Sequence, residues 1–357
     1  MNFPHLINFM NFMDYPTEFG RKFANVLKFC AMKKIALMTG GNSGEYEISL
    51  LSAQNIFNRL DKSKYEPYMI LLKGNNWTYT DETGHSTEVD RNDFSLTLNG
   101  KKILFDAVFI AIHGNPGENG RLQSYFDMVG IPYTGCDMLS SALTFNKFYC
   151  NIVVKALGVP VSPSLHFFKG DKIDFPKVGE VCGYPCFVKS CNSGSSVGVT
   201  KVHGENELAA AIDEAFKYDD QILIEKMIHG REIACGVVRL QGEIKPLAIT
   251  EIVTKTEFYD YTCKYSDGLH DLITPADFPA DVTERINQYA VKVFRELGCG
   301  GIVRVDFIVT ADETPYFLEV NTIPGQTSMS IVPSQVETLG LNLTEVYSQL
   351  IEEALAK

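Results

Sequence analysis

The sequence predicts a three-domain protein, with an open α/β sheet on its N-terminal side and α+β structure after it. Three observations support this prediction. A chain of 357 residues is too long for one small core. In the N-terminal third, a strand, a glycine turn and a helix follow one another twice. After residue 135, short strands alternate with helices. We expect an N-terminal extension and three domains over residues 1–31, 32–135, 136–228 and 229–357.

The composition is that of a well-packed globular protein, with 45% apolar and 11% aromatic residues. A formal net charge of −12 argues against nucleic acid as a partner, because nucleic-acid-binding proteins usually carry a basic field. No apolar run reaches the roughly 18 residues of a membrane span. Residues 1–31 lack the basic start and the continuous apolar stretch of a secretory signal. We therefore expect a cytoplasmic protein whose fold begins near Lys33, after a loosely attached extension or an upstream start codon that precedes Met32.

The nine cysteines are scattered singly along the chain. Cys182 and Cys186 form the closest pair, and a zinc site that adds His166 or His203 is one interpretation of their spacing. We favour the other interpretation, in which the cysteines are buried reduced thiols of a cytoplasmic protein.

In the N-terminal domain, Lys34–Thr39 is predicted to be a buried strand that ends at Gly40-Gly41. A second apolar run, Ala107–Ile112, leads into a glycine-rich turn and a predicted helix over Arg121–Val129. An amphipathic helix is expected after the first strand, and its apolar side is formed by Ile48, Leu51, Ile56 and Leu60.

The central domain is predicted to have strands over residues 186–189, 197–200 and 221–225. A helix precedes the last of them, with an apolar side of Leu208, Ala211, Ile212 and Ala215. In the C-terminal domain, Asp281 and Glu284 form a capping-box pattern and Gly298 is the predicted stop of a helix. Its apolar stripe is Ile286, Ala290, Val293 and Leu297.

The strongest functional signal is a predicted hairpin formed by residues 301–310 and 315–321, with a turn at 311–314. A hairpin symmetric about this turn places Asp306 opposite Glu319 and Arg304 opposite Asn321. Facing carboxylates repel each other and weaken a sheet, and a divalent cation removes the repulsion. Oxygen ligands suit Mg²⁺. The alternative is an exposed polar face with ordinary cross-strand pairs.

Two glycine-containing loops are candidate contacts for substrates. In residues 189–198, small residues allow backbone N–H groups to approach phosphate, and Lys189 adds charge. A flexible surface hairpin is the alternative for this loop. In residues 40–45, Glu45 can hold a substrate ammonium, or it can merely favour the N-terminus of the following helix. The loop lacks the G-x-G-x-x-G pattern of dinucleotide-binding proteins, which argues against a nicotinamide cofactor.

Three further segments carry groups of interest. The turn Thr322–Gly325 is rich in backbone donors that can hold an anion or an oxyanion. His113 follows a predicted strand, where a structural hydrogen-bond donor is more common than a catalytic base. The segment Phe258–Tyr265 combines aromatic and charged residues in a long connection, which is typical of a lid, although it can also be a loop packed on a neighbour.

Five of these segments, in this order along the chain, resemble the D-alanine–D-alanine ligases of the ATP-grasp superfamily. They are residues 40–45, 113–114, 189–198, 258–265 and 304–330. The resemblance runs from about Met32 to near the C-terminus. It implies a three-domain ATP-grasp architecture, with the nucleotide held between the central and C-terminal domains. It also implies ATP and two Mg²⁺ ions, with Mn²⁺ as a substitute, D-alanine as substrate, and a homodimer.

The resemblance also implies a role for each matching residue. Glu45 would take the ammonium of the first D-alanine, and Ser195 and Tyr265 would close a lid with it. The remaining roles fall into three groups. The ATP phosphates would contact Lys147, Lys189 and Lys264; the adenine would contact Glu225, Lys226, Ile228 and Phe258, and the ribose Glu232. The metal ligands would be Asp306, Glu319 and Asn321, and the second substrate and the oxyanion would contact Arg304, the Gly325 N–H and Ser330.

The sequence departs from the family pattern at a few positions. Asn119 replaces the usual aspartate of a Gly-Glu-Asp-Gly loop, and Ser190 replaces the proline that usually follows Lys189. Asn192-Ser193 replaces an Arg-Glu pair. The implied reaction is formation of an acyl phosphate from the first D-alanine and ATP, followed by attack of the second amine. Alternatives are a ligase that makes D-alanyl-D-lactate or D-alanyl-D-serine, and a silent nucleotide-binding homologue.

Overall fold

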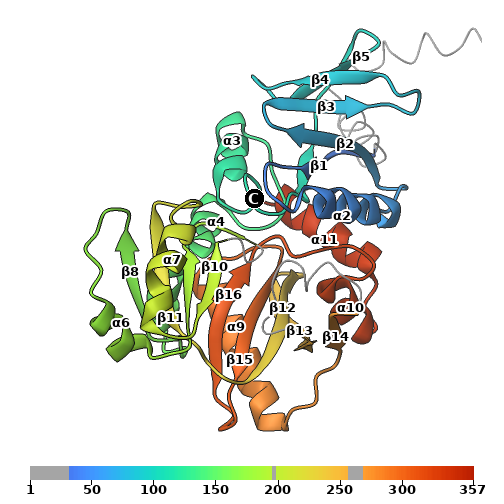
Figure 1. Ribbon diagram of the computed structural model, residues 1–357. Helices are drawn as coiled ribbons and strands as arrows, with labels where there is room; N and C mark the ends of the chain where they lie inside the picture. The colour runs from blue at the N-terminus through green and yellow to red at the C-terminus, as the bar shows by residue number, and fades with distance from the viewer. Residues whose placement is uncertain (1–31, 195–197, 256–267) are drawn as a thin grey trace, which may run out of the picture.

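The structure is a computed structural model that describes residues 32–194, 198–255 and 268–357. Three sheets of seven, four and five strands organise these residues, and Figure 1 shows them as three lobes around a common centre. None of the helices within these ranges has the length and apolar character needed to cross a bilayer.

The seven-stranded sheet is formed by the N-terminal part of the chain, in the order β6-β5-β4-β3-β2-β1-β7. The central strand β1 (Lys33–Gly40) is parallel to both neighbours, so its end and that of β7 meet at one edge. This confirms the two predicted strands, although the second ends at Ile110 instead of Ile112. The bounds of the other strands are β2 Tyr65–Lys73, β3 Asn76–Thr80, β4 Ser86–Asp90, β5 Ser95–Leu98, β6 Lys101–Ile103 and β7 Ala107–Ile110.

Two helices accompany this sheet, α2 (Tyr46–Arg59) and α3 (Arg121–Val129), and both were predicted. The predicted apolar side of α2 is only partly correct. Ile56 is buried as expected, but Leu51 is 58% exposed. The buried side of α2 instead includes Ser49 and Ser52, because these small side chains hydrogen-bond to His113.

The four-stranded sheet has the order β10-β9-β11-β8 and is antiparallel. Its helices α6 (Phe175–Cys182) and α7 (Glu205–Ala215) share one core cluster with its strands. The predicted central strands and helix are therefore confirmed, apart from the part that falls on residues 195–197, which lie outside the described ranges. The strand bounds are β8 Ser164–Phe168, β9 Cys186–Ser190, β10 Val199–Val202 and β11 Gln221–Lys226.

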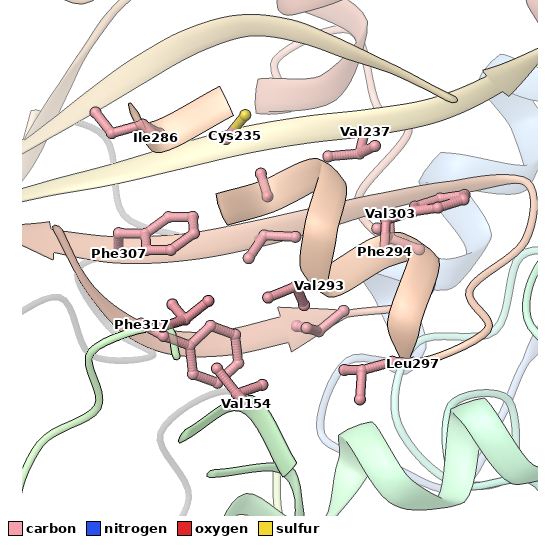
Figure 2. Close-up of a cluster of buried hydrophobic side chains, with 14 of the residues drawn as sticks. Val154, Cys235, Val237, Ile286, Val293, Phe294, Leu297, Val303, Phe307 and Phe317 are labelled. Carbon is pink, nitrogen blue, oxygen red and sulfur yellow. The ribbon is translucent and has the colours of Figure 1, made fainter. Parts of the chain in front are cut away.

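The five-stranded sheet, in the order β14-β13-β12-β15-β16, is formed by the C-terminal part of the chain. Figure 2 shows its main core, where Phe294 of helix α9 (Ala280–Glu296) packs near Val303. The apolar stripe of α9 is buried as predicted, and Gly298 follows its last residues with a φ of 67°. The strands are β12 Arg231–Leu240, β13 Glu243–Thr254, β14 His270–Ile273, β15 Ile302–Val309 and β16 Pro315–Asn321.

The predicted capping box of α9 is wrong. Pro279 occupies the N-cap position, and it has no side-chain hydrogen bond to offer. Asp281 lies inside the first turn and forms an ion pair with Arg285 at 3.6 Å. A carboxylate there still favours the helix N-terminus electrostatically.

Four more helices connect the sheets. Helices α4 (Met138–Phe145) and α5 (Lys147–Ala156) contact β16, and Cys150 and Val154 of α5 belong to the C-terminal core. Helices α10 (Ile331–Thr338) and α11 (Leu343–Leu355) follow the hairpin. Tyr347 of α11 packs edge-on against Phe109 of the N-terminal sheet at 5.8 Å between ring centroids. The N-terminal and C-terminal lobes thus share an apolar contact, and α5 belongs to the C-terminal core.

The predicted hairpin is present in β15 and β16, with a difference in register. At its turn Val309 pairs with Pro315, which leaves five residues in the loop instead of four. The register then shifts between the Phe307–Phe317 and Asp306–Glu319 pairs, so that Leu318 is an extra residue, a β-bulge. The longer loop and the bulge compensate each other, so the predicted pairs Asp306–Glu319 and Arg304–Asn321 are both confirmed.

Candidate active site

A cavity of about 900 Å³ lies where the three lobes meet, and its walls come from segments far apart in the sequence. Glu45 reaches it from the N-cap of α2, and Lys147 reaches it from the first turn of α5. The hairpin and the turn after it form another wall. Seven sequence-predicted site residues line this cavity: Glu45, Lys147, Arg304, Glu319, Asn321, Gly325 and Ser330.

Six other predicted residues that the structure describes are not among the lining residues of this cavity: Lys189, Glu225, Lys226, Ile228, Glu232 and Asp306. Lys189 and Glu225 form an ion pair at 3.3 Å on neighbouring strands, with side chains 12% and 9% exposed. Lys226 is exposed, and Ile228 and Glu232 are partly buried around the start of β12. Asp306 lies behind the lining residues. The predictions for Ser195, Phe258, Lys264 and Tyr265, and with them the lid, fall outside the described residues.

The Arg304 guanidinium neutralises the Asp306 carboxylate two residues along β15. Its Nε donates to Oδ1 and its Nη2 donates to Oδ2, both at 2.8 Å. The two side chains are 13% and 5% exposed, so water screens this bidentate pair only weakly. Arg304 lines the cavity, whereas Asp306 is buried and is not among the lining residues.

The hairpin offers an oxygen-only set of ligands to a cation. Asp306 and Glu319 face each other across the strands, and Glu319 and Asn321 line the cavity. Carboxylate and amide oxygens fit Mg²⁺. Within the described ranges, no three His, Cys, Asp or Glu side chains gather into a metal-binding group. The predicted ligand set has only two carboxylates, and its third member is the Asn321 amide. The metal site therefore stays a prediction.

Lys147 connects the hairpin with the loop that begins at Lys189. Its Nζ donates to the Ser193 carbonyl at 2.6 Å and lies 3.9 Å from Glu319 Oε2. Asn146 caps α5 by accepting a hydrogen bond from the Tyr149 N–H, which fixes the helix end that carries Lys147. The Lys147 ammonium therefore lies between the Glu319 carboxylate, a predicted metal ligand, and the loop of small residues that contains Ser193.

The departures from the family pattern make local hydrogen bonds. Asn192 donates from its backbone N and its Nδ2 to Asp219 Oδ2, at 2.8 and 2.9 Å. Its Oδ1 accepts a hydrogen bond from Asn146 Nδ2 at 2.9 Å. In the other loop, Asn119 Nδ2 donates to Asn115 Oδ1 at 2.8 Å. Neutral amides therefore anchor these two loops.

His113 is a buried structural donor, as the sequence indicated. Its Nδ1 lies 2.7 Å from the Ile323 carbonyl, which can only accept, so Nδ1 carries the proton. Its Nε2 then accepts from the Ser52 hydroxyl at 2.9 Å when the ring is neutral. Burial lowers the pKa of His113 and thus favours the neutral ring.

Sequence reasoning missed Glu118, a buried carboxylate in the cavity wall. Its Oε2 accepts from the Gly114 N–H at 2.7 Å and its Oε1 accepts from the Ile323 N–H at 3.1 Å. Burial, aided by the charge of Glu45, raises the pKa of Glu118 to about 8. An acidic residue inside a glycine loop after a strand was the available signal.

The cysteine pair proposed as an alternative zinc site lies in the core of the central sheet. Cys182 and Cys186 are buried free thiols, and burial raises the pKa of Cys186 to about 11. His166 instead stacks on Phe148, with 3.9 Å between ring centroids. These surroundings are those of structural thiols and of a packed histidine.

The chain is similar to known proteins over nearly all of its described length. Residues 34–136 match the family model described as D-ala D-ala ligase N-terminus, and residues 153–352 match the one described as D-ala D-ala ligase C-terminus. A D-alanine–D-alanine ligase of Flavobacterium johnsoniae is 43% identical over 325 residues, which are 91% of this chain and 100% of that protein.

Solved structures give the same result. The D-alanyl-alanine synthetase A of Vibrio cholerae matches with a TM-score of 0.83 and 31% identity, over 91% of this chain and 99% of that one. The D-Ala:D-Ser ligase of Enterococcus faecalis matches with a TM-score of 0.81 and 33% identity, over 90% and 99%. These likenesses confirm the predicted mixed α/β fold of the ATP-grasp type. By its two family matches and its closely similar relatives, the chain belongs to the D-alanine–D-alanine ligase family.

Proposed function

We propose that the cavity between the three lobes is where this chain joins two D-alanine molecules with conversion of ATP to ADP. The chain is an ATP-dependent ligase, and its dipeptide product is a precursor of peptidoglycan. The observation that carries the assignment of the site is the meeting of Glu45, Lys147, Arg304 and Glu319 around one cavity. The Glu45 carboxylate suits the ammonium of a D-amino acid. The cationic side chains of Lys147 and Arg304 suit carboxylate and phosphate groups.

The chemistry needs activation, because condensation of a carboxylate with an ammonium is unfavourable in water. The carboxylate of the first D-alanine is therefore converted to an acyl phosphate by ATP. Glu45 accepts the ammonium of that D-alanine, and Lys147 neutralises the transferred phosphate. We assign Lys189, which forms an ion pair with Glu225, to the ATP phosphates, where it would add positive charge.

Attack of the second D-alanine's amine on the acyl carbon generates a tetrahedral oxyanion, which collapses to the peptide bond as the C–O bond to phosphate breaks and inorganic phosphate leaves. We assign stabilisation of this oxyanion to Arg304 and to the Gly325 N–H, with Ser330 beside them. A single donor of this kind contributes about 3 kcal/mol to the transition state. A Cβ on Gly325 would lie 2.7 Å from Ser330 Oγ, so these two groups occupy neighbouring positions at the cavity wall.

ATP acts here with Mg²⁺, and we propose that Asp306, Glu319 and Asn321 hold it. The ion supplies charge neutralisation for the triphosphate. These ligands would hold two ions, and Mn²⁺ would be able to replace Mg²⁺. The support is the facing carboxylate pair, together with the position of Glu319 and Asn321 at the cavity.

The test is an ADP-release assay with purified protein, ATP and Mg²⁺. We expect D-alanine to stimulate ADP release and D-alanyl-D-alanine to accumulate, and Glu319→Ala to abolish both. D-Lactate and D-serine as second substrates test the two acceptor alternatives, since mixed products in their presence would replace the dipeptide assignment. Absence of D-alanine-dependent ADP release in the wild type would refute the proposal, and nucleotide binding without turnover would favour the silent homologue.

Three further predictions stay proposals. We propose a homodimer, which the family resemblance implies, and a cytoplasmic location. We also propose that residues 1–31 are an extension and that the catalytic unit is divided at residues 135 and 228. The family match that begins at residue 34 supports the first boundary. Size measurement in solution tests the homodimer, and a variant that starts at Met32, assayed for ligation, tests the extension.

A further inference from the structure

The turn that carries Gly325 is held on both sides by side chains from the N-terminal lobe. Ile323, on one side, donates from its N–H to Glu118 Oε1 at 3.1 Å and accepts at its carbonyl from His113 Nδ1 at 2.7 Å. Gln326, on the other side, donates from its N–H to Ser52 Oγ at 3.1 Å. Its carbonyl accepts from Asn55 Nδ2 at 2.6 Å. Both backbone groups of each flanking residue are thus fixed by side chains more than two hundred positions away.

Glu118 is the member of this set that also holds the N-terminal side of the cavity. Its second oxygen accepts from the Gly114 N–H at 2.7 Å. Gly114 packs closely against the loop before α2, since a Cβ there would lie 2.7 Å from Ser43 Cβ and 3.7 Å from Glu45 Oε2. The Glu118 carboxylate therefore links the backbone of Gly114, which lies near Glu45, with the backbone of Ile323, two residues before Gly325.

We propose that Glu118 is a positioning residue that sets the Gly325 N–H against the substrate held by Glu45. This inference rests on the proposed function for its chemistry, and on the hydrogen bonds alone for its geometry. Glu118 touches no reacting atom in this role. It acts through the turn, because Pro324 and Gly325 lie between two residues whose backbones cannot shift without breaking these bonds.

A glutamate suits this position better than an amide. Two N–H groups point at Glu118 and each of its two oxygens accepts one, which favours the ionised form against the effect of burial on its pKa. The amide of a Glu118→Gln variant has one acceptor and would turn its NH₂ toward one of the two N–H groups. The Ile323 N–H also lies 3.2 Å from Asn321 Oδ1, so this variant weakens the fixation of the turn without leaving that N–H unpaired.

The experiment compares Glu118→Gln with a matched control, Glu353→Gln. Glu353 is also a carboxylate that accepts a backbone N–H, from Gly301 at 3.2 Å, but it lies on α11 and is not among the lining residues of the cavity. We expect Glu118→Gln to lower kcat by about 10-fold to 100-fold, the cost of a misplaced catalytic group. The affinity for a phosphinate analogue of D-alanyl-D-alanine, whose phosphorus is tetrahedral, should fall in parallel. The affinity for ATP should stay the same, and Glu353→Gln should leave the ratio of the two affinities unchanged.

A second readout does not depend on activity. Backbone hydrogen exchange in residues 322–326 should become faster in Glu118→Gln and not in Glu353→Gln. This readout separates the two proposals, because wild-type protein without ligase activity would refute the proposed function and leave the fixation of the turn testable. If Glu118→Gln does not fold, Ser52→Ala removes a bond on the other side of the turn and should show the same pattern.

The inference is overturned if Glu118→Gln keeps wild-type kcat and exchange rates. It is also overturned if the affinities for ATP and for the phosphinate fall equally, since the whole cavity would then have been disturbed.

Discussion

Arg304 and Asp306, two residues apart on β15, form a bidentate ion pair in which two N–H···O distances are both 2.8 Å. Our interpretation gives them different tasks, since Arg304 serves the oxyanion and Asp306 serves the metal ion. In this pair, each side chain neutralises the charge of the other. A metal ion that binds Asp306 would compete with the Arg304 guanidinium for the same carboxylate oxygens. The oxyanion would compete with Asp306 for the Arg304 guanidinium.

The first prediction concerns this pair. Asp306→Asn should lower ligase activity by about 100-fold and raise the Mg²⁺ concentration needed for half-maximal activity, because an amide binds the cation less strongly than a carboxylate. ADP release measured against Mg²⁺ concentration tests this. The matched control is Asp312→Asn in the exposed turn of the same hairpin, which should keep wild-type values. An unchanged Mg²⁺ dependence in Asp306→Asn would remove Asp306 from the metal site.

The second prediction concerns Lys147. Lys147→Ala should raise the KM for ATP by about 10-fold to 100-fold, because a charged hydrogen bond to phosphate contributes about 1.5 to 3 kcal/mol. Its effect on the KM for D-alanine should be smaller. Lys155→Ala, at the exposed last turn of the same helix, is the control and should behave as the wild type. Equal changes in both variants would show that Lys147 has no special role.

The third prediction concerns the pH dependence of stability. Burial lowers the pKa of His113 below its ordinary value of 6.5 in the folded state. Below about pH 6.5 the unfolded chain therefore binds more protons at this residue than the folded chain does. Stability should fall as the pH falls, by up to about 1.4 kcal/mol per pH unit.

The comparison of wild type with His113→Gln isolates this group, because the other groups titrate in both proteins. The loss of Tm between pH 7.5 and 5.5 should be smaller in the variant. The exposed His85 provides the control, and His85→Gln should lose as much Tm as the wild type. Parallel curves for wild type and His113→Gln would contradict the prediction.

The fourth prediction concerns two glycines. Gly179 lies inside α6 without a positive φ, and a Cβ there would meet Tyr184 Cε2 at an ordinary 3.4 Å. Gly179→Ala should stabilise the protein by about 0.5 to 1 kcal/mol, because alanine loses less backbone freedom in a helix. In Gly117→Ala the new Cβ would lie 2.0 Å from the Ile112 carbonyl oxygen, so that variant should be strongly destabilised. Denaturant unfolding compares both with the wild type, and a stabilised Gly117→Ala would contradict this geometry.

The sequence alone determined the elements whose signals are local. Alternating residues defined β15 and β16, and the apolar stripe of α9 marked the side that is buried. It also determined which chemical groups the chain brings to phosphate and metal, because glycine loops and facing carboxylates are visible in the residue order. The family resemblance added the reaction, which pattern alone left unspecified.

The tertiary structure decided features that depend on long-range packing. The β-bulge at Leu318 allows Phe317 and Val320 both to face the core, and strict alternation cannot show this. The buried side of α2 includes Ser49 and Ser52 as well as Ala53 and Ile56, because the two serines hydrogen-bond to His113, which apolar spacing cannot show.

Glu118 gains its place only when Gly114 and Ile323 come together across 209 residues of chain, from position 114 to position 323. Local residue spacing determines on which side of a helix or strand a side chain lies. The residues that this side contacts depend on how the three lobes pack. The sequence could therefore name most of the groups at the site, but only the fold showed what holds them in position.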